Sequence, residues 1–346
     1  MNRTPAPPAH PLPHCTIVPP HILDRLAEQG HEAARRSLAL DAAHRANRLL
    51  AAPARPPAHR LTRTIADARH TETLPGRTVR REGGAPVADG SVDRAYDGLG
   101  ATFALYEQVY GRESIDGAWL PLDATVHYGD HYDNAFWNGS RMVFGDGDGE
   151  IFTDFTSCLD VIGHELTHGV TQYTAGLDYQ DQSGALNESL SDVFGSLVKQ
   201  YALGQSSAEA DWLIGAGLLA PGINGVALRS MKAPGTAYDD ERLGKDPQPA
   251  HMDDYVQTAS DAGGVHINSG IPNHAFYLVA DALGGHAWER AGQVWYDTLT
   301  GGTLSPAADF TAFARATVAA ARARWADDAV TDTVVAAWSQ VGISTT

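Results

Sequence analysis

Two histidines spaced one helical turn apart are the residues in this sequence that most clearly indicate metal binding. Residues 161–170 read VIGHELTHGV, and on a helix His164 and His168 share one face, so both imidazoles can reach the same ion. The apolar flanks would bury them, and buried histidines beside a buried acid need a shared partner, of which a cation is the simplest. Glu165 follows His164 directly and points off the shared face, which suits a catalytic base better than a ligand.

Glu188 is the candidate for a third ligand. It lies twenty residues after His168 in the run NESLSD, where a helix places Asp192 one turn further on the same face. A catalytic zinc takes three protein ligands and keeps one position for water, which two histidines and a glutamate provide. Asp192 could fix the second ring nitrogen of a ligating imidazole, and Asn187 is assigned a similar supporting role. The alternative, exposed helix histidines and a solvated acid, is disfavoured by the apolar flanks.

The overall composition is that of an acidic globular protein. The chain has 346 residues, of which 43% are apolar and 19% charged, and its formal net charge is −17. This length allows two domains and a small appendage, and the composition is not that of a disordered chain. The negative charge argues against a nucleic-acid-binding surface and favours a self-repelling monomer.

Cysteine content and apolar runs restrict the compartment only in part. Cys15 and Cys158 are too few for a disulfide framework, and both are predicted to be free thiols. The first fifteen residues, MNRTPAPPAHPLPHC, have prolines where a Sec signal peptide needs an apolar run, and no eighteen-residue apolar stretch occurs. We therefore expect neither a Sec signal nor a membrane span, and both cytoplasmic retention and export by a non-Sec route stay open.

Residues 1–58 are predicted to form a separate N-terminal segment. A Pro-rich start is followed at 22–50 by the spaced apolar positions of one or two short amphipathic helices, and AAPARPPAHR at 51–60 looks like a linker. Residues 1–60 hold eight arginines and four acids, a net of +4, which leaves −21 on the rest of the chain. The segment fits a propeptide that docks on an acidic body, and the alternative is a helical extension without a regulatory role.

Residues 59–175 are expected to form a lobe that contains both strands and helices. Strands with turns are predicted at 64–90 and antiparallel strands at 119–152, because short alternating runs there are broken by Gly and Asp. Helices are predicted at 92–110 and at 157–170, the second of which carries the two histidines.

Residues 176–346 are expected to form a mainly helical lobe, so the predicted fold class is α+β with two lobes. The helical pattern continues from Glu188 almost to the C-terminus. The expected interruptions are loops near residue 221, at 232–254 and at 301–308.

Four separated motifs resemble the thermolysin family of metallopeptidases. The similarity extends from about residue 93 to residue 343. The motifs, in the order of the family, are YDNAFW at 132–137, the run 160–192, LRSM at 228–231 and GGVHINSGI at 263–271. The resemblance implies a thermolysin-like fold in which a central zinc-binding helix joins the two lobes.

The resemblance also implies roles around the zinc. Tyr179 and His266 would donate hydrogen bonds to the oxyanion, with Asp261 orienting His266. The alternative to a catalytic role is that Tyr179 is an ordinary aromatic residue of the core and His266 an ordinary histidine of a loop. The groups that would hold an extended peptide along a strand edge are Asn134, the Ala135 backbone and Arg229.

The implied function is that of a zinc-dependent neutral endopeptidase acting on peptides or proteins. Zinc would activate a water and polarise the scissile carbonyl, and Glu165 would take the proton of that water and pass it to the leaving amine. An apolar pocket beside the zinc predicts a preference for a bulky hydrophobic residue on the P1' side. The residues that match this pocket, which are core residues in the alternative interpretation, are Phe152, Phe155, Val161, Ile214 and Leu228.

The N-terminal segment resembles the short precursor segment of the protealysin subgroup through HCTIVPPHIL at 14–23. This implies an inhibitory prosegment that lies over the cleft and is removed near residues 50–65. Cys15 could cap the zinc with its thiolate, which is a good zinc ligand. Alternatively, Pro19, Pro20 and their apolar neighbours dock the segment by packing.

One departure from the family concerns calcium. Asp160 and Asp211 match two acids of the double calcium site of thermolysin, but Lys199, Leu213 and Ala216 replace three others. An ammonium group cannot bind calcium, so the double site is predicted to be absent, with Lys199 neutralising the two remaining acids. A single calcium elsewhere stays open.

Two rival functions differ from an endopeptidase. One is another zinc hydrolase with the same two histidines and a distal glutamate, such as an aminopeptidase, which the motifs outside the zinc helix disfavour. The other is a catalytically inactive binding protein on the same fold, which is disfavoured because every expected ligand, base and oxyanion donor is present.

Overall fold

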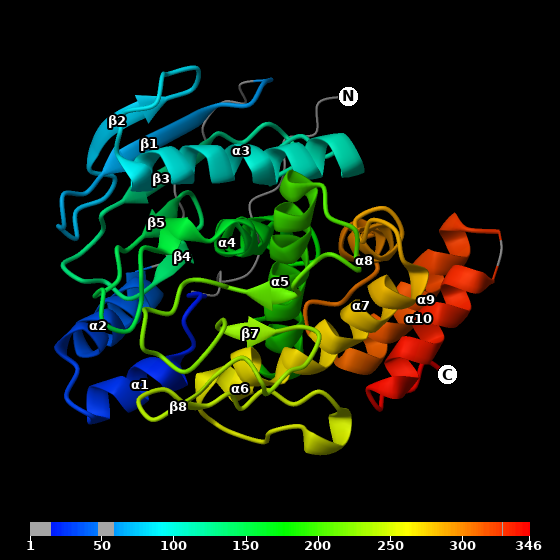
Figure 1. The fold of residues 1–346 in the computed structure, drawn as a ribbon. Helices are drawn as coiled ribbons and strands as arrows, with labels where there is room; N and C mark the ends of the chain where they lie inside the picture. The colour runs from blue at the N-terminus through cyan, green and yellow to red at the C-terminus, as the bar shows by residue number, and fades with distance from the viewer. Residues whose placement is uncertain (1–14, 48–58, 327) are drawn as a thin grey trace.

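A five-stranded sheet organises the N-terminal half of the chain. The computed structural model describes residues 15–47, 59–326 and 328–346 (Figure 1). The sheet has the order β2-β1-β3-β5-β4. Its strands are β1 (Arg63–Asp67), β2 (Arg77–Arg81), β3 (Leu122–Val126), β4 (Ala135–Trp137) and β5 (Met142–Phe144).

The strand pairing in this sheet is mixed. β1 with β2 and β4 with β5 are antiparallel, but β3 runs parallel to both β1 and β5. The prediction of antiparallel strands at 119–152 was therefore right for β4 and β5 and wrong for β3. Helix α3 (Gly90–Tyr110) lies between β1 and β3 in the sequence and packs on both, and a parallel pair requires such a crossover.

Two long helices cross at the centre of the molecule and connect its two halves (Figure 1). These are α4 (Leu159–Gln172), which follows the short helix η1 (Phe155–Ser157), and α5 (Asp181–Leu203). Glycines lie at the crossing: a Cβ atom on Gly195 would lie 2.4 Å from the carbonyl oxygen of Asp160, and one on Gly163 would lie 3.0 Å from the Gly195 Cα. The two backbones approach this closely because no side chain separates them.

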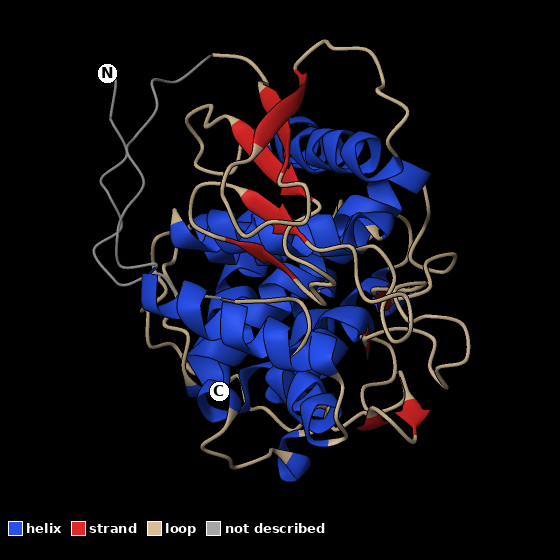
Figure 2. Cartoon of the chain, turned by 90° about the vertical axis from the view of Figure 1, so that its left-hand side faces the viewer, coloured by secondary structure: helices blue, strands red, loops and turns tan. Residues whose placement is uncertain are grey.

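The C-terminal half is a cluster of helices, coloured yellow to red in Figure 1, and Figure 2 shows the C-terminus surrounded by helices. The segment 204–260 that precedes them is more irregular than predicted, and several of its glycines, such as Gly215 and Gly222, have positive φ. That segment contains β6 (Leu213–Ile214), β7 (Arg229–Ser230), β8 (Asp239–Asp240), β9 (Gly244–Lys245) and η2 (Met252–Asp254). The helices are α6 (Asp261–Asn268), α7 (Gly270–Leu283), α8 (Ala291–Thr300), α9 (Phe310–Arg324) and α10 (Ala329–Gln340).

The N-terminal segment forms two helices, α1 (Pro20–Glu28) and α2 (Glu32–Asn47), as predicted for 22–50. The apolar side chains Ile22, Leu23 and Leu26 of α1 are buried in the main core. α2 lies beside β4 and β5 (Figure 1), with its Ser37 hydroxyl accepting a hydrogen bond from the Asp133 N–H. The Pro-rich start at 1–14 and most of the predicted linker, 48–58, lie outside the described residues.

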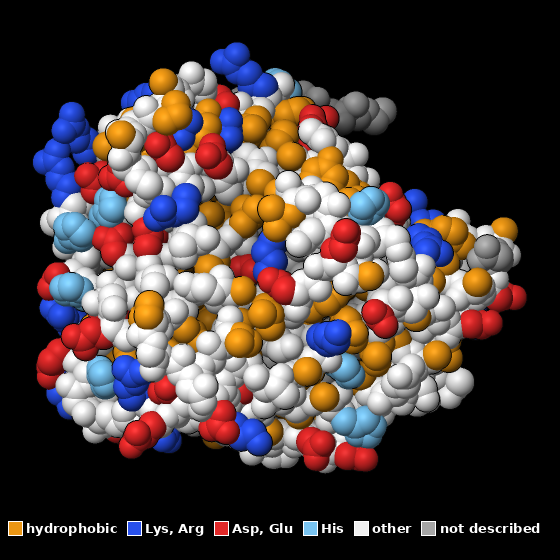
Figure 3. Space-filling view, in the orientation of Figure 1, with side chains coloured by type: hydrophobic (Ala, Val, Ile, Leu, Met, Phe, Trp, Pro, Cys, Tyr) orange, Lys and Arg blue, Asp and Glu red, His pale blue; other side chains and the backbone are white. Residues whose placement is uncertain are grey.

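Cys15 and Cys158 are both buried free thiols. In the parts of the chain that the structure describes, no helix is long and apolar enough to cross a membrane. On the face shown in Figure 3, acidic and basic side chains are interspersed.

Candidate metal centre and substrate cleft

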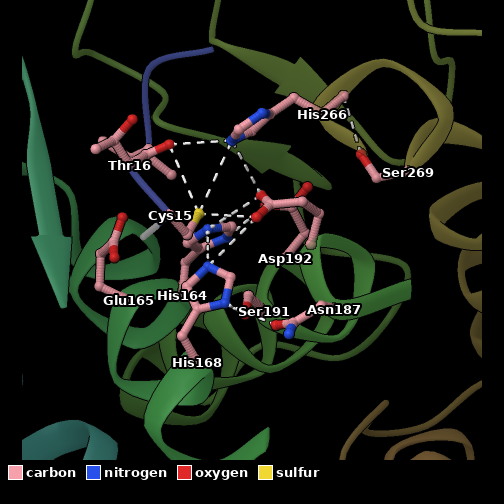
Figure 4. A network of polar contacts seen from close by, with 12 residues as sticks. Cys15, Thr16, His164, Glu165, His168, Asn187, Ser191, Asp192, His266 and Ser269 are labelled. Carbon is pink, nitrogen blue, oxygen red and sulfur yellow. Dashed lines mark hydrogen bonds and ion pairs between the residues drawn. The ribbon is translucent and has the colours of Figure 1, made fainter. Parts of the chain in front are cut away.

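The α4–α5 crossing brings the three predicted ligands together. His164 and His168 lie one turn apart on α4, and their Nε2 atoms are 3.1 Å apart. Glu188 reaches them from α5, with Oε2 lying 3.6 Å from His164 Nε2 and Oε1 lying 3.6 Å from His168 Nε2. Figure 4 shows the His164 and His168 rings pointing toward Cys15, and Glu188 belongs to the same cluster of possible ligands.

The other ring nitrogen of each histidine has a fixed partner. His164 Nδ1 lies 2.8 Å from Asp192 Oδ1, as predicted from the spacing of Glu188 and Asp192. His168 Nδ1 lies 2.8 Å from Asn187 Oδ1 and 3.1 Å from Ser191 Oγ. These contacts fix both rings with their Nε2 atoms directed at Glu188. Hydrogen-bond partners of this kind commonly orient the histidine ligands of a metal.

A buried ion network holds Asp192 in turn. Arg229 donates hydrogen bonds to both of its carboxylate oxygens at 2.8 Å, and the Asn273 amide donates a third at 2.8 Å. Burial works to raise the pKa of Asp192, but Arg229 and His164 hold it well below its usual range. Ser191 and Asn273 were missed by the sequence analysis. The helical spacing of Ser191 from Glu188 could have identified it, whereas nothing local indicates Asn273.

The donor set fits a zinc ion. Glu188 is 1% exposed, and its Oε2 has no hydrogen-bond partner among the described residues although it faces two imidazoles. Burial would raise the pKa of Glu188, but His266, His168 and His164 lower it to about 2, so the group is an anion. Two imidazoles and a carboxylate that converge within bonding range of one point, all buried, match the ligands and geometry that zinc prefers.

Cys15 joins the same cluster from the N-terminal segment. One donor atom from each of Cys15, His164, His168 and Glu188 lies within 4.8 Å of the others. The thiol lies 2.8 Å from Glu188 Oε1 and 3.8 Å from His266 Nε2 (Figure 4). Burial, with the charges of Glu188 and Glu165, raises the pKa of this thiol, so it needs a cation beside it to become a thiolate.

Glu165 lies on the sheet side of the cluster. It is fully buried, and its Oε2 accepts a hydrogen bond of 2.9 Å from the backbone N–H of Trp137 on β4. This contact with the edge strand fixes the carboxylate next to the groove in which a peptide would lie.

Tyr179 and His266 face the cluster from the opposite side. The Tyr179 hydroxyl lies 2.5 Å from Glu188 Oε1 and 3.3 Å from His266 Nε2. His266 Nδ1 lies 2.6 Å from Asp261, the partner that the family resemblance implies. Burial works to lower the pKa of His266, but Asp261 and Glu188 raise it to about 9, so the imidazole carries a proton on each nitrogen near neutral pH.

The start of α6 is shaped to place His266. Asp261 and Ala262 have φ values of 53° and 49°, and the two glycines that follow also have positive φ. This turn lets Asp261 accept hydrogen bonds from both the backbone N–H and the ring of His266. Non-glycine residues rarely adopt such φ values, and they concentrate at functional sites.

Residues 15–18 of the N-terminal segment lie in the cleft, with a bend at Ile17 and Val18. The Ile17 N–H donates to the Ala135 carbonyl at 3.1 Å, and the Ile17 carbonyl accepts from Arg229 at 3.1 Å. The Val18 N–H donates to Asn134 Oδ1 at 2.9 Å. These are the three groups that the sequence analysis assigned to peptide binding.

The preceding carbonyl points at the predicted oxyanion donor. Thr16 O lies 3.1 Å from His266 Nε2 (Figure 4). The Thr16–Ile17 peptide bond therefore lies between His266 and the strand-edge contacts. The predicted pocket residues Phe152, Phe155, Val161, Ile214 and Leu228 are all buried in the main apolar core, which also contains Ile17.

Comparison with known proteins places this chain in a family. Residues 42–172 match the family described as Thermolysin metallopeptidase, catalytic domain, and residues 175–343 match Thermolysin metallopeptidase, alpha-helical domain. The chain is 54% identical to an extracellular metalloprotease of Pectobacterium carotovorum subsp. carotovorum over 337 residues, which cover 96% of this chain and 97% of that protein. It is 53% identical to Protease PrtS of Photorhabdus sp. (strain Az29), over 82% of this chain and 76% of that protein.

A solved structure gives the same result. The precursor of protealysin, a metalloproteinase from Serratia proteamaculans, matches with a TM-score of 0.87 and 55% identity, covering 95% of this chain and 100% of that chain. The fold and the site define a two-lobed metallopeptidase. The chain belongs to the thermolysin family, in its protealysin-like branch, and is a zinc metalloendopeptidase in precursor form.

Proposed function

We propose that this precursor, once its N-terminal segment is removed, hydrolyses peptide bonds on the amino side of a bulky hydrophobic residue. The observation that carries the proposal is the binding of residues 15–18, because their backbone makes the contacts expected of a substrate. In that register Ile17, a branched apolar residue, occupies the position that follows the reacting carbonyl. This supports a P1' preference for side chains of similar character.

The catalytic residues divide the work as follows. His164, His168 and Glu188 would hold Zn²⁺, which when bound acts as a Lewis acid toward water and the scissile carbonyl. Glu165, oriented by the Trp137 N–H, takes a proton from the attacking water and delivers it to the leaving amine. The gain expected from such proton transfer is on the order of 10²–10⁴-fold in rate.

Charge that develops on the carbonyl oxygen is met by two donors. Tyr179 offers a hydroxyl and His266 a protonated Nε2, and the Asp261 carboxylate keeps the His266 ring in place. Donors that are fixed before the reaction stabilise the developing oxyanion without reorganising, and the loss of one such donor costs on the order of 10²–10³ in kcat.

The substrate clamp is supported by contacts at the strand edge. Asn134, the Ala135 carbonyl and Arg229 would align the peptide in extended form beside β4, as an added strand. Arg229 is also ion-paired with Asp192, and Asp192 in turn contacts the His164 ring. The residue that binds the peptide therefore also helps to orient a zinc ligand.

Inhibition in the precursor is proposed to use both mechanisms that the sequence left open. The Cys15 thiol would fill the ligand position that water needs, since its sulfur already lies in the ligand cluster. Packing adds to it, because Ile17, Val18 and Leu23 of the segment are buried in the main apolar core. Hydrogen bonds also hold α2, since Asp41 accepts from Tyr132 at 2.5 Å and from the Asn134 amide at 3.1 Å. We propose that the N-terminal segment, residues 1–58, is removed by cleavage near residues 50–65. The remaining chain would consist of the two lobes, residues 59–175 and 176–346.

Three further properties concern calcium, export and partners. Lys199 Nζ lies 2.7 Å from Asp160 and 2.9 Å from Asp211, which supports an ammonium group replacing the double calcium site. The relatives are named as extracellular proteases, which supports the proposal that this chain is exported. The net charge supports a monomer that binds peptide substrates and not nucleic acid.

A blocked peptide with a central Gly-Leu bond tests the proposed activity. The trimmed protein should cleave it at that bond, whereas trimmed Glu165→Ala should bind zinc and leave the peptide intact. The untrimmed precursor is the matched control for the role of the N-terminal segment. Bound zinc without cleavage after trimming would refute the proposed reaction, and cleavage only at peptide ends would favour an aminopeptidase.

A further inference from the structure

A second cluster of metal-binding side chains lies at one edge of the five-stranded sheet. Strands β1, β3 and β5 are mutually parallel neighbours, so their carboxyl ends meet at that edge. His70 follows β1, His127 follows β3 directly and Asp146 follows β5, while Asp89 caps the start of α3. The carboxyl edge of parallel strands is where ligand sites form in such sheets.

The spacing of the donor atoms suits one metal ion. His127 Nδ1 lies 2.9 Å from each oxygen of Asp146, and His70 Nδ1 lies 3.3 Å from Asp146 Oδ2. One donor atom from each of the three residues lies within 4.8 Å of the others. With bonds of about 2.0–2.1 Å, two ligand atoms of a tetrahedral zinc lie about 3.3 Å apart, so only small shifts would be needed.

The second nitrogen of His127 is held as in a metal-binding histidine. His127 Nε2 lies 3.1 Å from Asp89 Oδ2. Asp89 is itself fixed, because its Oδ1 accepts the N–H groups of Ser91 at 3.0 Å and Val92 at 3.3 Å at the start of α3. The arrangement repeats that of His164 and Asp192 in the catalytic cluster, and such carboxylate partners orient histidine ligands.

Backbone conformation and exposure also suit a site that can load an ion. His70 and His127 have φ values of 57° and 52°, and the His70 N–H donates to the His127 carbonyl at 2.8 Å, which holds the two rings side by side. The His70 side chain is 61% exposed and that of Asp146 is 27% exposed, so an ion can enter from solvent. Strained φ values of this kind concentrate at functional positions.

We propose that His70, His127 and Asp146 form a second site for a divalent transition metal, structural in role, with Asp89 orienting His127. Two imidazoles and one carboxylate favour zinc, copper or nickel over calcium or magnesium, which prefer oxygen ligands. The ion would join three strand ends to the start of α3. An ion that binds only the folded chain raises its thermal midpoint as the ion concentration rises.

The test is a zinc titration of the full-length precursor that already carries its catalytic zinc. The expected result is a second zinc per chain by calorimetry and elemental analysis, with a rise in the thermal midpoint. His70→Ala should lose this second equivalent and the rise, while retaining the catalytic zinc, which checks that it is folded. His131→Ala, an exposed histidine on the loop after β3, is the matched control and should behave like the unsubstituted chain.

A second variant tests the role of the orienting carboxylate. Asp89→Asn keeps an acceptor for the helix cap but removes the one that faces His127, so the second zinc should bind about 10–100-fold more weakly. The proposal would be overturned if the unsubstituted precursor took up only one zinc from an excess. It would equally be overturned if His70→Ala bound the second zinc with unchanged affinity, and in either case His127 would serve only as an ionic bridge between Asp146 and Asp89.

Discussion

The substitution Gly195→Ala tests whether the close crossing of α4 and α5 builds the metal centre. The added Cβ atom would lie 2.4 Å from the Asp160 carbonyl oxygen and 2.9 Å from the His164 backbone nitrogen. Both contacts are with backbone atoms of α4, which cannot rotate away as a side chain can. Since nonbonded heavy atoms settle at about 3.5 Å or more, the helices would have to separate by roughly 1 Å.

That displacement is large compared with what zinc coordination tolerates. His164 and His168 lie on α4 and Glu188 on α5, so separating the helices lengthens the ligand distances between them. Metal–ligand distances hold to about ±0.2 Å, so zinc affinity and activity should both fall. Overpacking of a buried contact should also lower the free energy of unfolding by about 1–3 kcal/mol.

The assay combines zinc content after dialysis with urea unfolding of the full-length precursor. Gly90→Ala is the matched control, because the same change at the start of α3 meets chiefly the end of the flexible Arg94 side chain, at 2.8 Å. The control should keep its zinc and change stability by about 0.5 kcal/mol or less. If Gly195→Ala bound zinc and unfolded like the control, the reasoning about the helix crossing would be refuted.

Three further predictions concern the prosegment and the calcium position. Cys15→Ser should make the precursor cleave a blocked peptide faster at unchanged zinc content, and an unchanged rate would mean that packing alone inhibits. Burial, with the charge of Asp148, raises the pKa of Asp133 from 3.8 to about 8 beneath α2, so the docked state retains a proton that the released state loses. Prosegment docking should therefore be strongest below about pH 4 and weaken as the pH rises to about 8. Asp133→Asn should flatten this profile when prosegment release is measured against pH, and an unchanged profile would show that Asp133 does not cause it. Lys199→Ala should lower the free energy of unfolding by about 3 kcal/mol, because it leaves the buried carboxylate of Asp160 without its ion-pair partner. A calcium chelator too weak to remove zinc should leave the thermal midpoint of the unsubstituted protein unchanged, and a large drop in that midpoint would show that calcium is bound.

The metal centre was predictable because its geometry is local. His164 with His168, and Glu188 with Asp192, are each four residues apart on one helix, and helical spacing alone directs each pair to one face. Asn273 contacts Asp192 from 81 residues away, and Cys15 contacts Glu188 from 173 residues away. No spacing rule reaches such partners, which is why Asn273 was missed and the role of Cys15 stayed open.

Sheet pairing and the second cluster were hidden for the same reason. The short runs that form β3 and β5 indicate strands, but the direction in which β3 pairs is decided by the crossover through α3. His70, His127 and Asp146 belong to three different strand ends and have no motif in common, so only the assembled sheet brings them together. The irregular segment 204–260 was overestimated in helix content because apolar spacing does not reveal where glycines adopt positive φ.

Returning zinc to the trimmed, metal-free protein tests the central claim most directly. Activity on the blocked peptide and bound zinc should be measured in the same samples as zinc is added stepwise. If His164, His168 and Glu188 hold the one ion on which the reaction depends, activity should be absent at the start and rise in proportion to bound zinc. Activity should level off once the first zinc per chain is bound, and zinc taken up beyond that at the proposed second site should add no activity. Full activity in the metal-free protein would contradict the account.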